Sequence, residues 1–200
     1  MQAVRIAPVE GEQRMEFLIV KTRSVLLIGT SHRYQLAENP ADSEFGYFVK
    51  RAAGAFEVRA IAEESSHEVL AQYHAVQSVC EQIAHAMGIA HRYCDPDSRQ
   101  RQALDIRHER DIRLDAFFNG WETDERRLER EIRASYAARE RYWLNQLTDL
   151  DWWPVLFVCG ANHVEHFGCN IQSSNLHAEV VAFDWPELRI NFAIKHSGKH

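Results

Sequence analysis

Two histidine residues follow apolar segments that end in the same pattern. Apolar residues 25–28 precede Gly29-Thr30-Ser31-His32, and apolar residues 155–159 precede Gly160-Ala161-Asn162-His163. Imidazole can ligate a metal ion and can act as a general acid or base near neutral pH. Unbroken apolar runs are typical of strands that are buried on both faces, and a glycine lets the backbone turn or approach a ligand closely. We therefore expect each histidine at the carboxyl end of a central parallel strand, where open α/β sheets place their ligand sites.

Carboxylates follow a third strand candidate, residues 57–62, which ends in Glu63 and Glu64. Parallel neighbouring strands bring their carboxyl ends to one edge of the sheet, so these side chains are expected near His32 and His163. Successive residues of a strand point to opposite faces, and only one of the two glutamates can then reach the site. The sequence leaves open which one it is.

A fourth strand candidate, residues 90–94, is followed by Asp95 and Asp97. Asp95 is a candidate for the same site and, because Pro96 follows it, equally a candidate for a turn residue. A long helix is predicted over residues 123–150, where apolar residues recur at steps of three and four. Arg139 falls on its apolar stripe, so an acidic partner or an anionic ligand must compensate its charge. His166 would lie one helical turn beyond His163, where a surface role is expected.

These elements predict an α/β protein with a mixed, mostly parallel central sheet flanked by helices, in a single compact domain over residues 1–200. A strand over residues 15–20 is expected to form an antiparallel hairpin with the first central strand, and residues 188–194 alternate as an edge strand does. Ser65 and Glu68 form a capping-box pattern that starts a helix expected to run to Gly88. Residues 1–14 are weakly patterned. The charged residues 98–125 are a candidate insertion or lid, but their composition favours a solvated connection.

The composition excludes several classes of function. With 23 Lys and Arg against 29 Asp and Glu, the formal charge of −6 disfavours nucleic acid as a partner. No apolar run is long enough to cross a bilayer, so we expect a cytoplasmic protein with no membrane partner. The four cysteines show no metal-site spacing and are expected to be reduced. A phosphate-binding loop and a Gly-x-Ser-x-Gly elbow are absent, which leaves Ser31 as a weak nucleophile candidate.

Two kinds of chemistry fit the candidate residues. His32, His163 and one carboxylate could bind a divalent transition metal such as Zn, Mn or Co and leave a position open for a reactive water. The same residues could instead work without a metal, with a histidine as the general base. In either case Arg139 would orient the carboxylate, hold an anionic part of the substrate or stabilise an oxyanion.

The order of the four segments resembles that of the TIKI/TraB-like superfamily, which is related to erythromycin esterase and to the haem-binding ChaN group. The matching segments are Gly29-Thr30-Ser31-His32, Ala62-Glu63-Glu64, Arg139-Glu140-Arg141-Tyr142-Trp143 and Gly160-Ala161-Asn162-His163. Glu140 and Trp143 stand where the family more often has Asn or Asp and Met. The resemblance implies an α/β fold with a site at the strand ends that contains His32, Glu63 or Glu64, Arg139 and His163. For TIKI members it implies a metal-dependent peptidase, whereas erythromycin esterases hydrolyse esters without an evident metal.

The sequence therefore predicts a hydrolase that cleaves a peptide or an ester in a small-molecule or peptide substrate. Its metal ligands would be His32, His163 and Glu63, and its other catalytic residues Glu64 and Arg139. The alternatives are a metal-independent esterase and a non-catalytic module that binds a small molecule or haem. A further alternative is an effector domain, for which the tryptophan-rich segment over residues 143–153 would form a surface rather than core.

Overall fold

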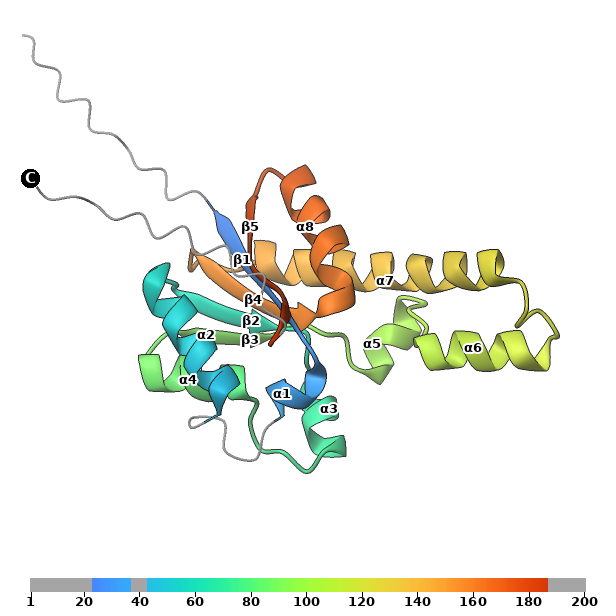
Figure 1. Ribbon diagram of the computed structural model, residues 1–200, viewed down its shortest axis with the longest axis horizontal. Coiled ribbons are helices and arrows are strands. Elements are labelled where there is room, and N and C mark those ends of the chain that lie inside the picture. The colour runs from blue at the N-terminus through green and yellow to red at the C-terminus, as the bar shows by residue number, and fades with distance from the viewer. Residues whose placement is uncertain (1–22, 37–42, 187–200) are drawn as a thin grey trace, which may run out of the picture.

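The computed structural model describes residues 23–36 and 43–186, which form a three-layer α/β/α fold (Figure 1). Its sheet has five strands in the order β3-β2-β4-β1-β5, and all its pairings are parallel. The strands are β1 (Ser24–Thr30), β2 (Ala60–Glu63), β3 (Ala90–Tyr93), β4 (Val155–Gly160) and β5 (His177–Trp185). The predicted parallel sheet flanked by helices is confirmed. The strands expected over residues 15–20 and 188–194 lie outside the described residues.

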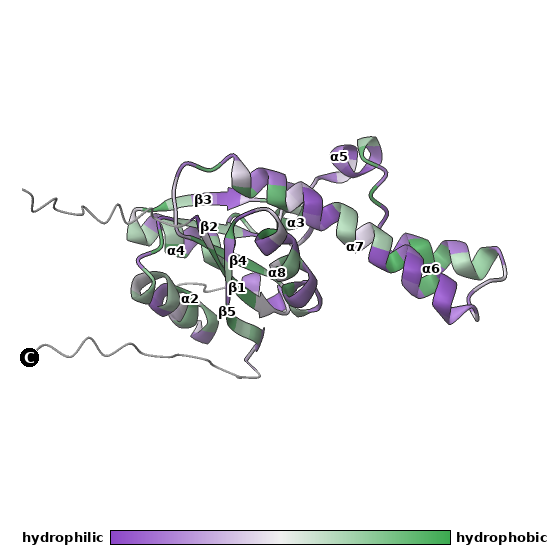
Figure 2. Ribbon diagram, turned by 90° about the horizontal axis from the view of Figure 1, so that it is seen from above, coloured by the Kyte–Doolittle hydropathy of each residue, from purple (hydrophilic) through white to green (hydrophobic). Residues whose placement is uncertain are grey.

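Helices cover both faces of the sheet. On one face α2 (Glu44–Ala55) and α4 (Val79–Met87) form a core with residues such as Leu26 and Leu156. On the other face α7 (Glu125–Thr148) and α8 (Val164–Ser173) pack against residues such as Leu27 and Phe157. Because β1 and β4 are buried on both faces, their apolar residues do not alternate with polar ones. Figure 2 shows these apolar strands between more polar helices.

The carboxyl ends of the two central strands lie side by side. β1 pairs with β4 in a register that sets Gly29 opposite Cys159 and Thr30 opposite Gly160. The two Gly-x-x-His segments are thus offset by one residue. Short helices follow both strands, α1 (His32–Gln35) after β1 and a 3-10 turn (Ala161–His163) that leads into α8. The edge where both histidines were predicted is therefore built from two helix starts.

One predicted helix is wrong in extent. The segment expected to be helical from Ser65 to Gly88 forms α3 (His67–Gln72) and α4, which are separated by a loop. Each has its own serine cap: Ser66 accepts from Val69 N–H, and Ser78 accepts from Glu81 N–H. Val76, an expected core position, is 92% exposed. The predicted stop at Gly88 is confirmed, because this residue ends α4 in the left-handed conformation (φ 65°).

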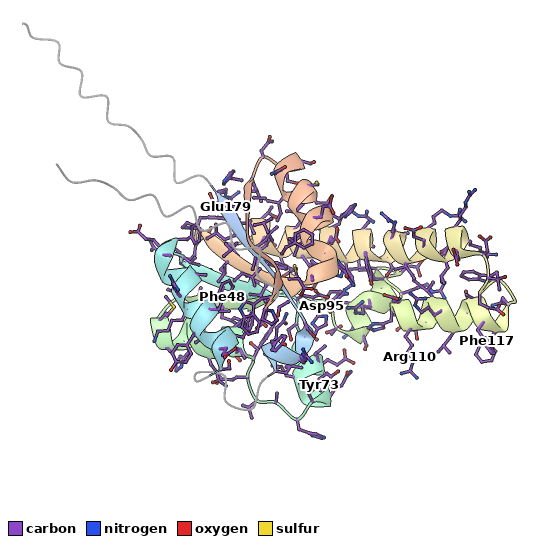
Figure 3. All side chains as sticks on the ribbon, viewed as in Figure 1. Phe48, Tyr73, Asp95, Arg110, Phe117 and Glu179 are labelled. Atoms are coloured by element: carbon purple, nitrogen blue, oxygen red, sulfur yellow. The ribbon has the colours of Figure 1, made fainter. Side chains whose placement is uncertain are left out.

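Residues 98–125 form two helices, α5 (Ser98–Ala103) and α6 (Glu109–Phe118), before α7 begins. α6 packs along the first half of α7, and the two helices project from the sheet as an arm with Phe117 near its tip (Figures 1 and 3). Ile112, Ala116 and Trp121 form a small core inside this arm. Within the described residues, no helix is long and apolar enough to cross a membrane.

Candidate active site

Glu64 lies at the centre of the candidate site. It directly follows β2, and its backbone N–H donates to Val158 O, which fixes the side chain at the carboxyl end of the sheet. Its Oε1 accepts a hydrogen bond of 2.6 Å from Arg139 Nη2, and its Oε2 accepts one of 2.7 Å from Gly160 N–H. His32 Nε2 and His163 Nε2 lie 3.6 Å and 3.8 Å from Oε1. One carboxylate therefore connects the ends of β1, β2 and β4 with α7.

Neighbouring groups keep the carboxyl group of Glu64 ionised. Burial by itself would raise the pKa of this carboxyl group, but Arg139, His32, His163 and the Gly160 N–H lower it below its usual value of 4.5. Arg139 stays protonated, because Glu64 and Asp95 raise its pKa although burial opposes this. Glu64 is thus an anion that can only accept hydrogen bonds.

The glycines that begin the two Gly-x-x-His segments have different structural roles. A Cβ atom at Gly29 would lie 1.9 Å from Phe183 O, so glycine allows the backbone of β5 to pass β1 closely. A Cβ at Gly160 would lie 3.3 Å from Glu64 Oε2 and 3.7 Å from His32 Nε2. Since Gly160 has an ordinary backbone conformation (φ −60°), what its missing side chain provides is open space between the imidazoles and the carboxylate.

His163 is oriented by a residue that the sequence did not single out. This residue is Glu140, which is buried and whose Oε1 lies 2.8 Å from His163 Nδ1. Its Oε2 accepts from Asn170 Nδ2 at 2.9 Å and from His166 Nδ1. Because a carboxylate oxygen only accepts, the contact requires the proton of His163 on Nδ1 and leaves Nε2 unprotonated in the neutral ring. His163 Nε2 is then a proton acceptor that faces Glu64.

Asp95 fixes the position of Arg139 by accepting hydrogen bonds from it and from its neighbours. Its Oδ1 accepts from Arg139 Nε at 2.9 Å and from Trp143 Nε1 at 3.0 Å, while its Oδ2 accepts from Arg101 Nη2 at 2.6 Å. This carboxylate is the acidic partner expected for Arg139, together with Glu64. Asp97 has a separate role, because it caps α5 through a capping box with Gln100.

Glu63 points to the opposite face of the sheet, as strand alternation requires. Its Oε1 lies 2.8 Å from His91 Nε2 and also accepts from Ser78 Oγ, and both of these residues belong to the α2 and α4 side of the protein. The geometry therefore places Glu64 with His32 and His163, and it places Glu63 away from them. The expectation that Glu63 is a metal ligand beside the two histidines does not agree with this arrangement.

A metal ion bound by His32 and His163 would share Glu64 Oε1 with Arg139. His32 Nε2 and His163 Nε2 both lie within 4 Å of Glu64 Oε1, so the imidazoles are close enough to share an ion. However, the guanidinium of Arg139 already donates to this same oxygen. Among the described residues, no group of three or more His, Cys, Asp and Glu side chains is arranged to hold a metal ion.

Neither candidate for a nucleophilic side chain fits the geometry. Ser31 is exposed at the start of α1 and makes no capping hydrogen bond through its side chain. Cys159 lies at the end of β4, but burial, followed by Glu64 and Glu140, raises the pKa of its thiol well above 9.0. A thiol that stays protonated is a poor nucleophile. The described cysteines are all free, as the sequence predicts.

No family model matches the chain, and comparisons with curated proteins and solved structures also find no match. The assignment of residues to the site therefore rests on their geometry. Of the predicted residues, the structure brings together His32, Glu64, Arg139 and His163, with Asp95 next to Arg139. Glu140 and His166 join them from α7 and α8. The signals for Glu140 in the sequence are its place beside Arg139 in the segment that resembles the family motif and its position three residues before Trp143.

Proposed function

We propose that the protein is a hydrolase in which His163 is the general base that activates water for attack on an ester or peptide bond. The observation that carries this proposal is the pairing of His163: Glu140 binds Nδ1 at 2.8 Å, and the opposite ring nitrogen faces Glu64 at 3.8 Å. A buried carboxylate on one imidazole nitrogen fixes the tautomer and stabilises the imidazolium that forms when the other nitrogen takes a proton.

The remaining residues fit defined roles in such a reaction. A water between the imidazoles would donate one proton to His163 Nε2 and a hydrogen bond to Glu64, and its oxygen would form the new bond to the carbonyl carbon. The leaving group would then receive a proton from His163 or from His32, which is 58% exposed and can meet a substrate. Arg139 holds Glu64 in place and contributes positive charge near the developing oxyanion.

Of the two activities that the resemblance to the TIKI/TraB-like superfamily implies, the proposed reaction corresponds to the metal-independent one. The hydrogen bond from Arg139 to the carboxylate oxygen beside the imidazoles supports this form, because it supplies positive charge at the place where a metal ion would. The substrate class stays a small molecule or peptide. The four cysteines that occur without disulfide partners are consistent with action in the cytoplasm.

The test is hydrolysis of p-nitrophenyl esters by protein purified without a histidine tag and dialysed against EDTA. We expect turnover to persist after dialysis and kcat/KM to fall by about 10²–10⁴-fold in His163→Ala, the range for loss of a general base. His177→Ala is the matched control, because His177 is exposed on β5 away from Glu64. Activity that EDTA abolishes and Zn, Mn or Co restores would support the metal-dependent form instead.

A binding module without catalysis is the second candidate, and a cavity favours it. A cavity of about 730 Å³ runs between α6, α7 and α8 and reaches Tyr136, Glu140 and His166. Its size is typical of sites for small molecules. Such a module would bind its ligand, or haem in that version, in both the wild type and Glu64→Gln, with no turnover in either.

A further inference from the structure

A second cavity, of about 440 Å³, adjoins the candidate site on the side of α5 and the start of α6. Tyr136 and Arg139 line it, so it opens next to the guanidinium that holds Glu64. Four arginines are among its lining residues, together with Glu109 and Asp111: Arg101, Arg107, Arg110 and Arg139. Carboxylates outside the lining pair with three of these arginines: Asp95 with Arg101 and Arg139, Glu64 with Arg139, and Asp115 with Arg107. Figure 3 shows Arg110 at the end of α6 that lies nearer α5, with its side chain pointing away from α7.

Arg101 is the most buried of these arginines and has one donor atom without a partner among the described residues. Its side chain is only 7% exposed, with Nη2 bound to Asp95 and Nε bound to Pro96 O. Its Nη1 is buried and has no hydrogen-bond partner within residues 23–36 and 43–186. Asp95 accepts from Arg101 Nη2, Arg139 and Trp143 but makes no hydrogen bond with Nη1. A buried cationic donor without a partner is costly, and an anion in the cavity would compensate it after a shift of the Arg101 side chain exposes Nη1.

The electrostatics of the cavity agree with this assignment. Burial lowers the pKa of His108, and the positive charges of Arg101 and Arg139 lower it further against the opposing effect of Asp111 and Asp95. Arg101 and Arg139 are thus close enough to His108 to influence its protonation. Glu109 does not cancel this charge freely, because it pairs with Arg113 and accepts from Tyr136.

We propose that this cavity binds an oxyanion, a carboxylate or phosphate group of the substrate, and so places the bond to be cleaved beside His163 and Glu64. Guanidinium groups are suited to this because their planar N–H donors match the oxygens of both anions. The inference rests on the proposed hydrolytic function, since it names the substrate class of that site. A substrate without a negative charge would lack this contact.

Titration of the protein with inorganic phosphate and, separately, with acetate tests the inference without any need for turnover. We expect saturable binding of at least one anion, and the tighter of the two identifies the group. The Arg107→Gln/Arg110→Gln variant changes residues at the cavity rim, and its affinity should fall by about tenfold or more through loss of charge-assisted hydrogen bonds. Arg101→Lys keeps a charge beside Asp95 but removes the Nη1 donor, so it should also bind more weakly.

Two controls separate this inference from the proposed function. Arg130→Gln removes a charge from an exposed position of α7 outside the cavity, and its affinity should equal that of the wild type. His163→Ala should bind the anion normally, whether or not hydrolysis is found. Binding of neither anion by the wild type would overturn the inference, and so would an affinity unchanged in the Arg107→Gln/Arg110→Gln variant. Anion binding that depends on the arginines, with no hydrolysis in any variant, would overturn the function alone.

Discussion

Replacement of Glu140 by glutamine is the substitution that probes the site most sharply, because it keeps the size of the side chain. The carboxylate of Glu140 accepts from His163 on Oε1 and from His166 and Asn170 on Oε2. Glutamine offers one acceptor oxygen and an NH₂ group. If the amide oxygen faces His163, the NH₂ group faces the N–H donors of His166 and Asn170, and none of these donors has an acceptor there. If the amide is reversed, the NH₂ group faces His163 Nδ1 instead.

Each of these two orientations of the amide has a measurable cost. A buried donor left unsatisfied costs about 1–3 kcal/mol, so the free energy of unfolding should fall by about that amount. The reversed amide also forces the proton of His163 onto Nε2, where the ring can no longer accept a proton from water. We therefore expect kcat/KM for p-nitrophenyl acetate to fall by about 10²–10⁴-fold in Glu140→Gln.

Urea unfolding and ester hydrolysis, measured on the same preparation of Glu140→Gln, check both effects. Asn170→Ala is the control, because it removes one donor to Glu140 and leaves the contact to His163 intact. It should lose stability but retain most of its activity. A Glu140→Gln variant with kcat/KM within twofold of the wild type, beside an inactive His163→Ala, would refute the idea that Glu140 orients the base.

Three further predictions concern the other contacts of the site. Gly160→Ala should fold normally, since its φ is ordinary, but should lose at least about tenfold in kcat/KM because the methyl group occupies the space beside Glu64; an unchanged rate would mean that no substrate atom or water uses this space. Glu64→Gln should lower kcat/KM by about 10²-fold or more, whereas Glu63→Gln, on the other face of the sheet, should retain activity within a few fold; the reverse order would place the reaction on the Glu63 side of the sheet. The lowered pKa of Glu64 stabilises the fold above the usual carboxyl value of 4.5, and this stabilisation is lost as the pH falls through the folded-state pKa; in Arg139→Gln the folded-state pKa rises because the largest opposing charge is gone, so the free energy of unfolding from urea titrations should be lower at neutral pH and should fall less on acidification than in the wild type or in the surface control Arg133→Gln, and a steeper fall would contradict the role of Arg139.

The fold could be predicted largely from the sequence because its strands are buried on both faces. The unbroken apolar runs that became β1 and β4, and the three- and four-residue steps of α7, are direct consequences of burial. The loop between α3 and α4 was missed because Tyr73 and Val76 continue a helical period although both are exposed. Only the second serine cap, Ser78, marks the break, and a serine inside an apolar pattern is a weak signal.

The sequence predicted site residues only where the periodicity of a strand or a helix determines which way a side chain points. Strand alternation predicted that one of Glu63 and Glu64 would leave the site, but which one depends on the face that α7 covers. Arg139 lies on the apolar stripe of α7, so its need for acidic partners followed from the sequence. Glu140 lies at the edge of that stripe, three residues before Trp143, but its burial also depends on the packing of α8 against α7, which is tertiary information.

The protonation state of His163 tests the central claim most directly, because it requires no substrate. The 15N NMR spectrum of protein with labelled histidine reports which ring nitrogen carries the proton, and the signals that disappear in His163→Ala assign this ring. We predict that neutral His163 carries its proton on Nδ1, donated to Glu140, with Nε2 unprotonated, and that Glu140→Gln removes this preference. A neutral His163 with its proton on Nε2 in the wild type would contradict the assignment of this nitrogen as the base.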